Sequence, residues 1–120
     1  MEETPHPTEL NRAAFEHAKR MIAEGRISTA TPWHAPSAEL GDETIARDGI
    51  GAYSIWFLGI HPGKSPETKE GYGFPISNDF TNVSLDGLRA ADSRAGQWKH
   101  DEIETAAREL YEAAKAAVGA

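Results

Sequence analysis

Residues 52–60 read Ala52-Tyr53-Ser54-Ile55-Trp56-Phe57-Leu58-Gly59-Ile60, the longest apolar run in the chain. The run is rich in β-branched and aromatic residues and is bounded by glycine and proline, which is typical of a buried strand. One face of such a strand carries Tyr53, Ile55 and Phe57, and the other carries Trp56, Leu58 and Ile60. Because both faces are apolar, we expect other elements to cover each of them.

Shorter strands are predicted on either side of this run. Asp48-Gly49 precedes it, and Asp-Gly favours a type I′ turn, which needs positive φ at both central residues. We therefore expect a β-hairpin in which residues 44–47 pair with the start of the long strand. Residues 72–76 are predicted to form an edge strand, because Pro75 has no backbone N–H to donate to a neighbour.

Amphipathic helices are predicted near both ends of the chain. Thr8 is a suitable N-cap for a helix over residues 8–24, with Gly25 as its stop. Asp101 and Glu104 have the spacing of a capping box for a helix over residues 101–118. A shorter helix is expected over residues 85–91, capped by Ser84.

These elements predict one α+β domain over residues 8–120, preceded by a flexible tail at 1–7. Its core would be a small, mainly antiparallel sheet of three or four strands centred on residues 52–60. The two terminal helices would pack on the sheet. The long connections at 26–41, with a short strand at 27–31, and at 61–71 would cover its ends or its remaining face.

The composition narrows the class of protein. The chain has 120 residues and a formal charge of −7, from 19 acidic and 12 basic residues, and it has no cysteine. The charge argues against a nucleic-acid or anionic-membrane binder, since both partners attract basic surfaces. The first seven residues show neither the basic start nor the apolar stretch of a signal peptide, and no run approaches the ~18 apolar residues of a membrane span, so we expect neither feature. We therefore expect a soluble cytoplasmic protein.

Gly63-Lys64-Ser65 follows the apolar run and resembles part of a phosphate-binding P-loop. The full motif needs a glycine at position 58, where this chain has leucine, and a long helix afterwards, which Pro66 and Gly71 oppose. A type II turn at residues 61–64, with Pro62 second and glycine third, explains the same sequence. We therefore predict no nucleotide cofactor.

Six residues are candidates for a ligand or partner surface, because they place chemically useful side chains in loops or at the ends of strands. They are Trp33, His34, His61, Lys64, Tyr72 and Asp79. Trp33 either plugs one end of the core or belongs to that surface. His61 is the only catalytic candidate, as an acid or base. The histidines show no ligand spacing, so we predict no metal, although His34, His61 and Asp79 would form a site if the fold brought them together.

Loop aromatics give a broader signal. Tyr72, Phe74, Phe80, Trp33 and Trp98 all lie beside glycine, proline or polar residues. If some of them stay exposed, they would form a patch that binds a partner or ligand.

No motif in the chain identifies a specific reaction. Two hypotheses of function remain. The favoured one is a non-enzymatic binding or regulatory module for a protein or small molecule, with a homodimer as one way to cover the second face of the central strand. The alternative is a small enzyme or ligand-binding protein with a pocket between the loops at 26–41 and 61–75. In that pocket His61 would be the acid or base, Lys64 an anion contact, and Trp33 or Tyr72 a stacking wall.

Overall fold

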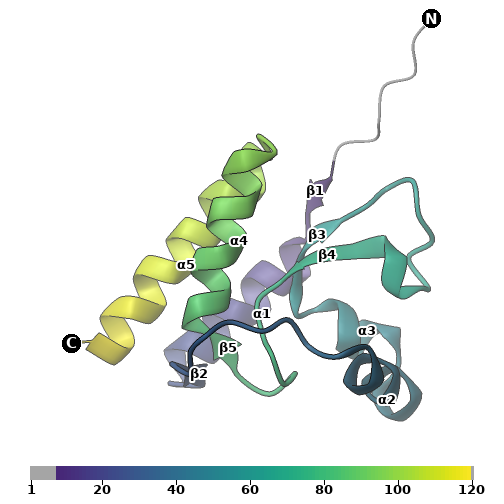
Figure 1. Ribbon diagram of the computed structural model, residues 1–120, viewed down its shortest axis with the longest axis horizontal. Helices are drawn as coiled ribbons and strands as arrows, with labels where there is room; N and C mark the ends of the chain where they lie inside the picture. Colours follow the sequence, from purple (N-terminus) through teal and green to yellow (C-terminus); the bar gives the residue numbers. More distant parts are fainter. Residues whose placement is uncertain (1–7, 120) are drawn as a thin grey trace, which may run out of the picture.

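The computed structural model describes residues 8–119 and confirms the α+β class, with five helices and five strands in that range (Figure 1). In chain order the elements are β1 (Glu9–Leu10), α1 (Arg12–Ala23), β2 (Ile27–Ser28), α2 (Ala38–Asp48), α3 (Ile50–Ser54), β3 (Phe57–Ile60), the 3₁₀ turn η1 (Lys69–Gly71), β4 (Tyr72–Pro75), β5 (Val83–Ser84), α4 (Leu85–Gln97) and α5 (Asp101–Gly119). The tail predicted at 1–7 lies outside the described residues.

The main sheet has three antiparallel strands in the order β1-β3-β4, so β3 is central and β4 is an edge strand as predicted. In the register, Gly59 of β3 lies opposite Leu10 of β1 and Gly73 of β4. A Cβ atom at Gly59 would lie 2.8 Å from Cδ2 of Phe74 and 2.9 Å from Cγ2 of Thr8. The centre of the sheet therefore requires glycine, because any side chain there would displace its neighbours.

The predicted hairpin is wrong. Ser37 caps α2, its Oγ accepting a hydrogen bond from the N–H of Leu40 at 3.1 Å, and the helix runs to Asp48. Gly49, at φ 93°, separates α2 from α3, whereas a type I′ turn also needs positive φ at Asp48. The connection predicted at 26–41 therefore ends at Ser37.

The central strand is shorter than predicted, since residues 50–54 are helical and only residues 57–60 form β3. A continuous apolar run fits a buried strand and a buried helical turn equally well, and the run contains both. Ile50, Tyr53 and Phe57 are three and four residues apart, which is a helical spacing that the strand reading overlooked.

The first helix also begins later than predicted, because residues 9–10 form β1 and Asn11, not Thr8, is the N-cap of α1. The Oδ1 of Asn11 accepts from the N–H of Ala14 at 3.4 Å. Its Nδ2 donates to the carbonyls of Ser54 at 3.1 Å and Phe57 at 3.0 Å. Asn11, which is 6% exposed, thus fastens the start of α1 to the junction of α3 and β3.

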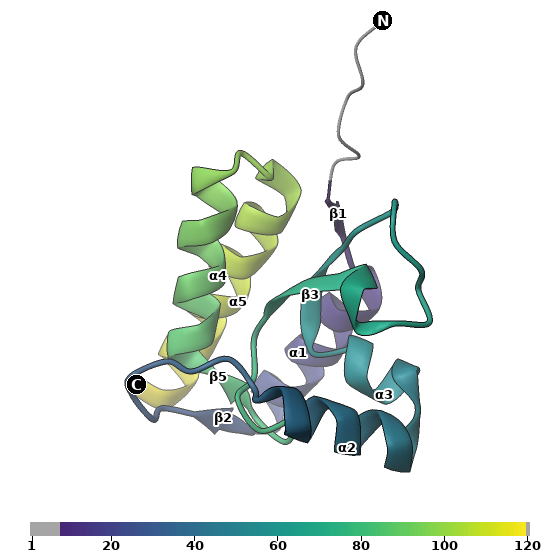
Figure 2. The same cartoon turned by 45° about the vertical axis from the view of Figure 1, so that its right-hand side comes forward.

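At the C-terminal end, α4 and α5 form an antiparallel helix pair beside the sheet (Figure 2). Ser84 caps α4 as predicted, accepting from the N–H of Gly87 at 2.9 Å, but α4 continues to Gln97 instead of ending near residue 91. The buried Ala91 and Ala95 explain the extension, because they continue the apolar face of α4 toward α5. The alanine-rich face of α5 thus packs mainly against a helix rather than the sheet.

Other parts of the chain cover both apolar faces of β3. Phe57 is 6% exposed and Leu58 is fully buried. The ring of Phe57 packs against those of Tyr53 and Phe80, at centroid distances of 4.6 and 6.3 Å. The helices α1 and α5 also contact β3. The two-sided strand therefore needs no second copy to cover it.

Ile27 of β2 pairs in parallel with Val83 of β5, so the strand predicted at 27–31 is present but shorter. Across residues 8–119, none of the helices combines the length and the apolar character that crossing a lipid bilayer requires.

Candidate functional site

The predicted site residues lie in separate places, and His61 directly follows the end of β3. Its Nδ1 shares a hydrogen bond with Oγ1 of Thr8 at 3.1 Å. Its ring rests against Gly73, where a Cβ atom would lie 2.7 Å from Nε2. His61 thus holds the segment before β1 against β4, and it lines none of the cavities described below.

Lys64 lies in the loop that follows β3, and Tyr72 is the first residue of β4, where that loop ends. The N–H of Lys64 donates to the carbonyl of His61 at 2.9 Å, which closes a turn where one was predicted, and the Lys64 side chain is exposed. The hydroxyl of Tyr72 donates to the carbonyl of Pro66 at 2.7 Å. Tyr72 therefore ties the loop back onto β4.

Asp79 organises the turn before β5. Its Oδ1 accepts hydrogen bonds from the N–H groups of Thr81 at 2.9 Å and Asn82 at 3.0 Å. His34 is exposed. Between residues 8 and 119 no three His, Asp or Glu side chains lie close enough to hold a metal ion, so His34, His61 and Asp79 do not form the conditional site.

The loops at 26–41 and 61–75 nevertheless contribute to one cavity of about 230 Å³, which we call the aromatic cavity. None of the six predicted residues lines it. Its walls are Ala35, Pro36, Ser37, Ala38, Tyr53, Phe57, Lys69, Pro75 and Phe80. A cavity thus lies between the two predicted loops, but its aromatic rings come from α3, from β3 and from the turn before β5.

Lys69 and Tyr53 give the aromatic cavity its polar groups. The Nζ of Lys69 donates to Oδ1 of Asp42 at 3.0 Å and to the carbonyl of Ala38 at 3.2 Å. Tyr53 is 6% exposed, and its hydroxyl, which has no acceptor among residues 8–119, remains accessible to solvent. Burial, and then the negative charge of Asp42, raise the pKa of Tyr53 above its usual value, so the phenol stays protonated.

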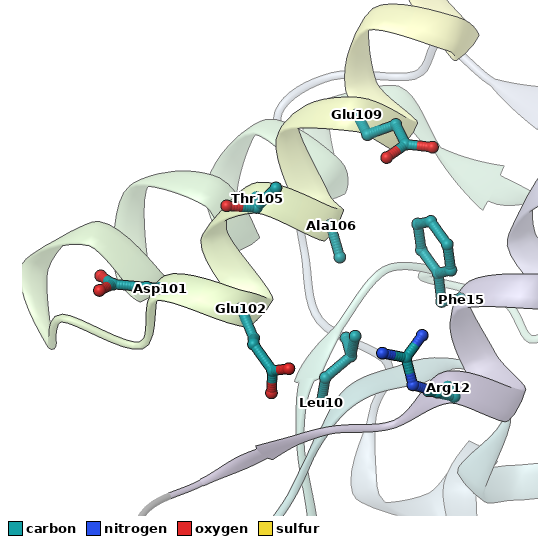
Figure 3. Close-up of a pocket in the computed structure, with 8 residues that line it drawn as sticks. All are labelled: Leu10, Arg12, Phe15, Asp101, Glu102, Thr105, Ala106 and Glu109. Carbon is teal, nitrogen blue, oxygen red and sulfur yellow. The ribbon is translucent and has the colours of Figure 1, made fainter.

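A second cavity, of about 370 Å³, lies between α1 and α5, and we call it the acidic groove (Figure 3). Leu10 and Phe15 from the β1–α1 segment face Ala106 of α5 across it. Its lining consists of Leu10, Arg12, Phe15, Asp101, Glu102, Thr105, Ala106 and Glu109. The groove therefore combines an apolar floor with three carboxylates, all on α5, and one guanidinium on α1.

In the part of the chain that the structure describes, two carboxylates of the acidic groove lack the ion-pair partners that other carboxylates on α4 and α5 have. Glu104 pairs with Arg108 at 2.9 Å, and Asp92 pairs with Arg108 at 3.2 Å. Within residues 8–119, by contrast, neither Glu102 nor Glu109 has an ion-pair partner. The α5 side of the groove thus presents negative charge that the described chain does not neutralise.

Sequence reasoning missed the acidic groove. Glu102, Thr105, Ala106 and Glu109 recur at helical spacing beside the buried stripe of α5, which was the available signal. Tertiary packing decides which element lies opposite that stripe of α5. Because α5 was predicted to pack on the sheet, Phe15 of α1 was not expected opposite it.

No protein-family model matches the chain, and neither does any curated protein or solved structure. The geometry of the aromatic cavity and the acidic groove therefore carries the functional argument.

Proposed function

We propose that the protein is a non-enzymatic binding module that receives an apolar, basic segment of a partner protein in the acidic groove. The observation that carries the proposal is the apolar floor of Leu10, Phe15 and Ala106 beside the unpaired carboxylates of Glu102 and Glu109. An apolar side chain placed on this floor would leave water, and burying one completely stabilises a complex by about 1.5 to 3 kcal/mol.

Charge would select and orient the partner. Lysine or arginine residues beside the apolar anchor would face Glu102 and Glu109 on α5. On the opposite side, Arg12 lines the groove and Lys19 lies 5.1 Å from the centroid of the Phe15 ring. A segment with basic residues along one flank would therefore bind in one direction, because like charges meet if it is reversed.

The chain's other properties support the same proposal. We place the module in the cytoplasm because it lacks cysteine, and we exclude nucleic acid as its partner because its formal charge is −7. The strand face that suggested a homodimer is covered by the chain itself, so covering it requires no second copy.

The test uses two synthetic amphipathic peptides that carry leucine at helical spacing, one with lysine and one with glutamate at the other positions. Each is titrated into the ¹⁵N-labelled protein. We expect the lysine peptide to shift the amide signals of Phe15, Thr105 and Ala106, and the glutamate peptide to leave them unchanged. A lysine peptide that shifts only signals elsewhere would show that the groove is not its site.

Variants separate the groove from general negative charge. Replacing both Glu102 and Glu109 with glutamine should weaken binding of the lysine peptide about fivefold, as expected for two exposed charge contacts. Glu43→Gln, on the exposed face of α2, removes a charge far from the groove and should leave affinity unchanged. If Glu43→Gln weakened binding of the lysine peptide equally, the net charge of the protein would explain the effect, and the proposal would be overturned.

A further inference from the structure

We infer that the aromatic cavity is a binding site for a small monocyclic aromatic carboxylate. This site is separate from the acidic groove and shares no lining residue with it. The inference therefore stands or falls independently of the proposed partner segment.

The walls of the cavity suit one flat ring. The rings of Tyr53, Phe57 and Phe80 form a cluster with centroid distances of 4.6 to 6.3 Å, and Pro36 and Pro75 add two further flat faces. Aromatic pairs in such a cluster are favoured in tilted and offset arrangements. A cavity of about 150 Å³ holds benzene in another protein. The 230 Å³ here thus accommodates one ring with a small substituent.

The polar groups at the cavity are hydrogen-bond donors. A Cβ atom at Gly41 would lie 3.0 Å from Cε1 of Tyr53 and 3.6 Å from Nζ of Lys69, so the phenol and the ammonium group adjoin the same face of α2. The Tyr53 hydroxyl has no acceptor among residues 8–119, and Lys69 uses two of its three N–H groups within the protein. Both can donate to a ligand oxygen.

The start of α2 adds further donors. Ser37 and Ala38 line the cavity, and the Oγ of Ser37 satisfies only the N–H of Leu40. The first N–H groups of a helix have no partner within the helix and favour an anion. These N–H groups, together with Tyr53 and Lys69, favour a ligand that accepts hydrogen bonds. A carboxylate offers two acceptor oxygens.

Two acidic residues of α2 lie near these donors: Glu39 in the first turn, and Asp42, whose negative charge raises the pKa of Tyr53. The Oδ1 of Asp42 lies 3.0 Å from Nζ of Lys69, so that pair has no net charge. The helix N-terminus and the neutral Tyr53 phenol then decide the preference of the site.

The experiment titrates benzoate, methyl benzoate and cyclohexanecarboxylate into the ¹⁵N-labelled protein. For a ligand of this size we expect a Kd on the order of 1 mM for benzoate. Benzoate should shift the amide signals of Tyr53, Lys69 and Phe80 and raise the melting temperature. Methyl benzoate, which lacks the charge, and cyclohexanecarboxylate, which lacks the flat ring, should each bind at least about fivefold more weakly.

Tyr53→Phe keeps the ring and removes only the hydroxyl, so it should weaken benzoate binding about fivefold while the protein stays folded. Tyr111→Phe makes the same change on α5, away from the cavity, and should have no effect. Absence of any benzoate-dependent shift, equal binding of methyl benzoate, or an unchanged affinity in Tyr53→Phe would each overturn the inference.

Discussion

A Cβ atom at Gly87 would lie 2.5 Å from Cζ3 of Trp33, so the indole occupies the space beside the first turn of α4. Trp33 is only partly exposed there, although it belongs to a long loop. Trp33 thus fastens the segment before α2 to the N-terminal end of α4, and it does so outside the hydrophobic core that it was predicted to plug.

We predict that Gly87→Ala destabilises the protein by about 1 to 3 kcal/mol, the usual cost of overpacking. Alanine is otherwise favoured over glycine inside a helix by about 1 kcal/mol, so a loss of stability would report the contact with Trp33. Urea denaturation measures the difference. Gly51→Ala is the matched control, because nothing lies within 4 Å of its added Cβ, and it should be neutral or stabilising. Equal stability of the Gly87→Ala variant and the unmodified protein would contradict the contact.

Asn11→Asp should destabilise the protein by about 2 kcal/mol, because a carboxylate cannot donate to the two carbonyls that Asn11 Nδ2 now binds. Aspartate and asparagine are comparable N-caps, so capping alone predicts no change. Chemical denaturation at neutral pH provides the measurement. Ser37→Asp, at the exposed N-cap of α2, is the control and should leave stability nearly unchanged. A similar small effect at Asn11 would mean that its bonds to Ser54 and Phe57 contribute little.

His17 should make stability depend on pH. Its Nδ1 is buried without a partner among residues 8–119, and its ring meets that of Trp56 edge-on at 4.7 Å. Burial, followed by the positive charge of Arg20, lowers the pKa of His17 below 6.5, while the Ile55 carbonyl and Glu24 partly oppose this shift.

Between that lowered pKa and the unfolded value of 6.5, the unfolded chain binds more protons than the folded one. The free energy of unfolding should therefore decrease as pH falls through about 6.5. Denaturation at a series of pH values tests this. His17→Phe, which retains a ring against Trp56, should show a smaller decrease, whereas His34→Gln at an exposed position should behave like the unmodified protein. The same slope in all three proteins would refute the role of His17.

Local signals in the sequence correctly predicted several elements. The apolar stripe of α1, the Ser84 cap of α4 and the edge strand with Pro75 depend on residues within one or two turns of each other. Such short-range patterns constrain the backbone directly, which is why the α+β class was predictable. The predicted capping box of Asp101 and Glu104 is not formed, because Asp101 is already the first residue of α5 and the N–H of Glu104 donates to the carbonyl of His100.

The sequence by itself thus determined the buried stripes of α1 and α5 and the start of α4 after its cap Ser84. Only the tertiary structure decided that residues 50–54 are helical, because an apolar run is compatible with either conformation until its neighbours are in place. It also decided that the Nδ2 of Asn11 donates to the carbonyls of Ser54 and Phe57 at the α3–β3 junction, and that Phe15 lies across the acidic groove from α5. Those relationships join residues more than 40 positions apart, and no local pattern encodes them.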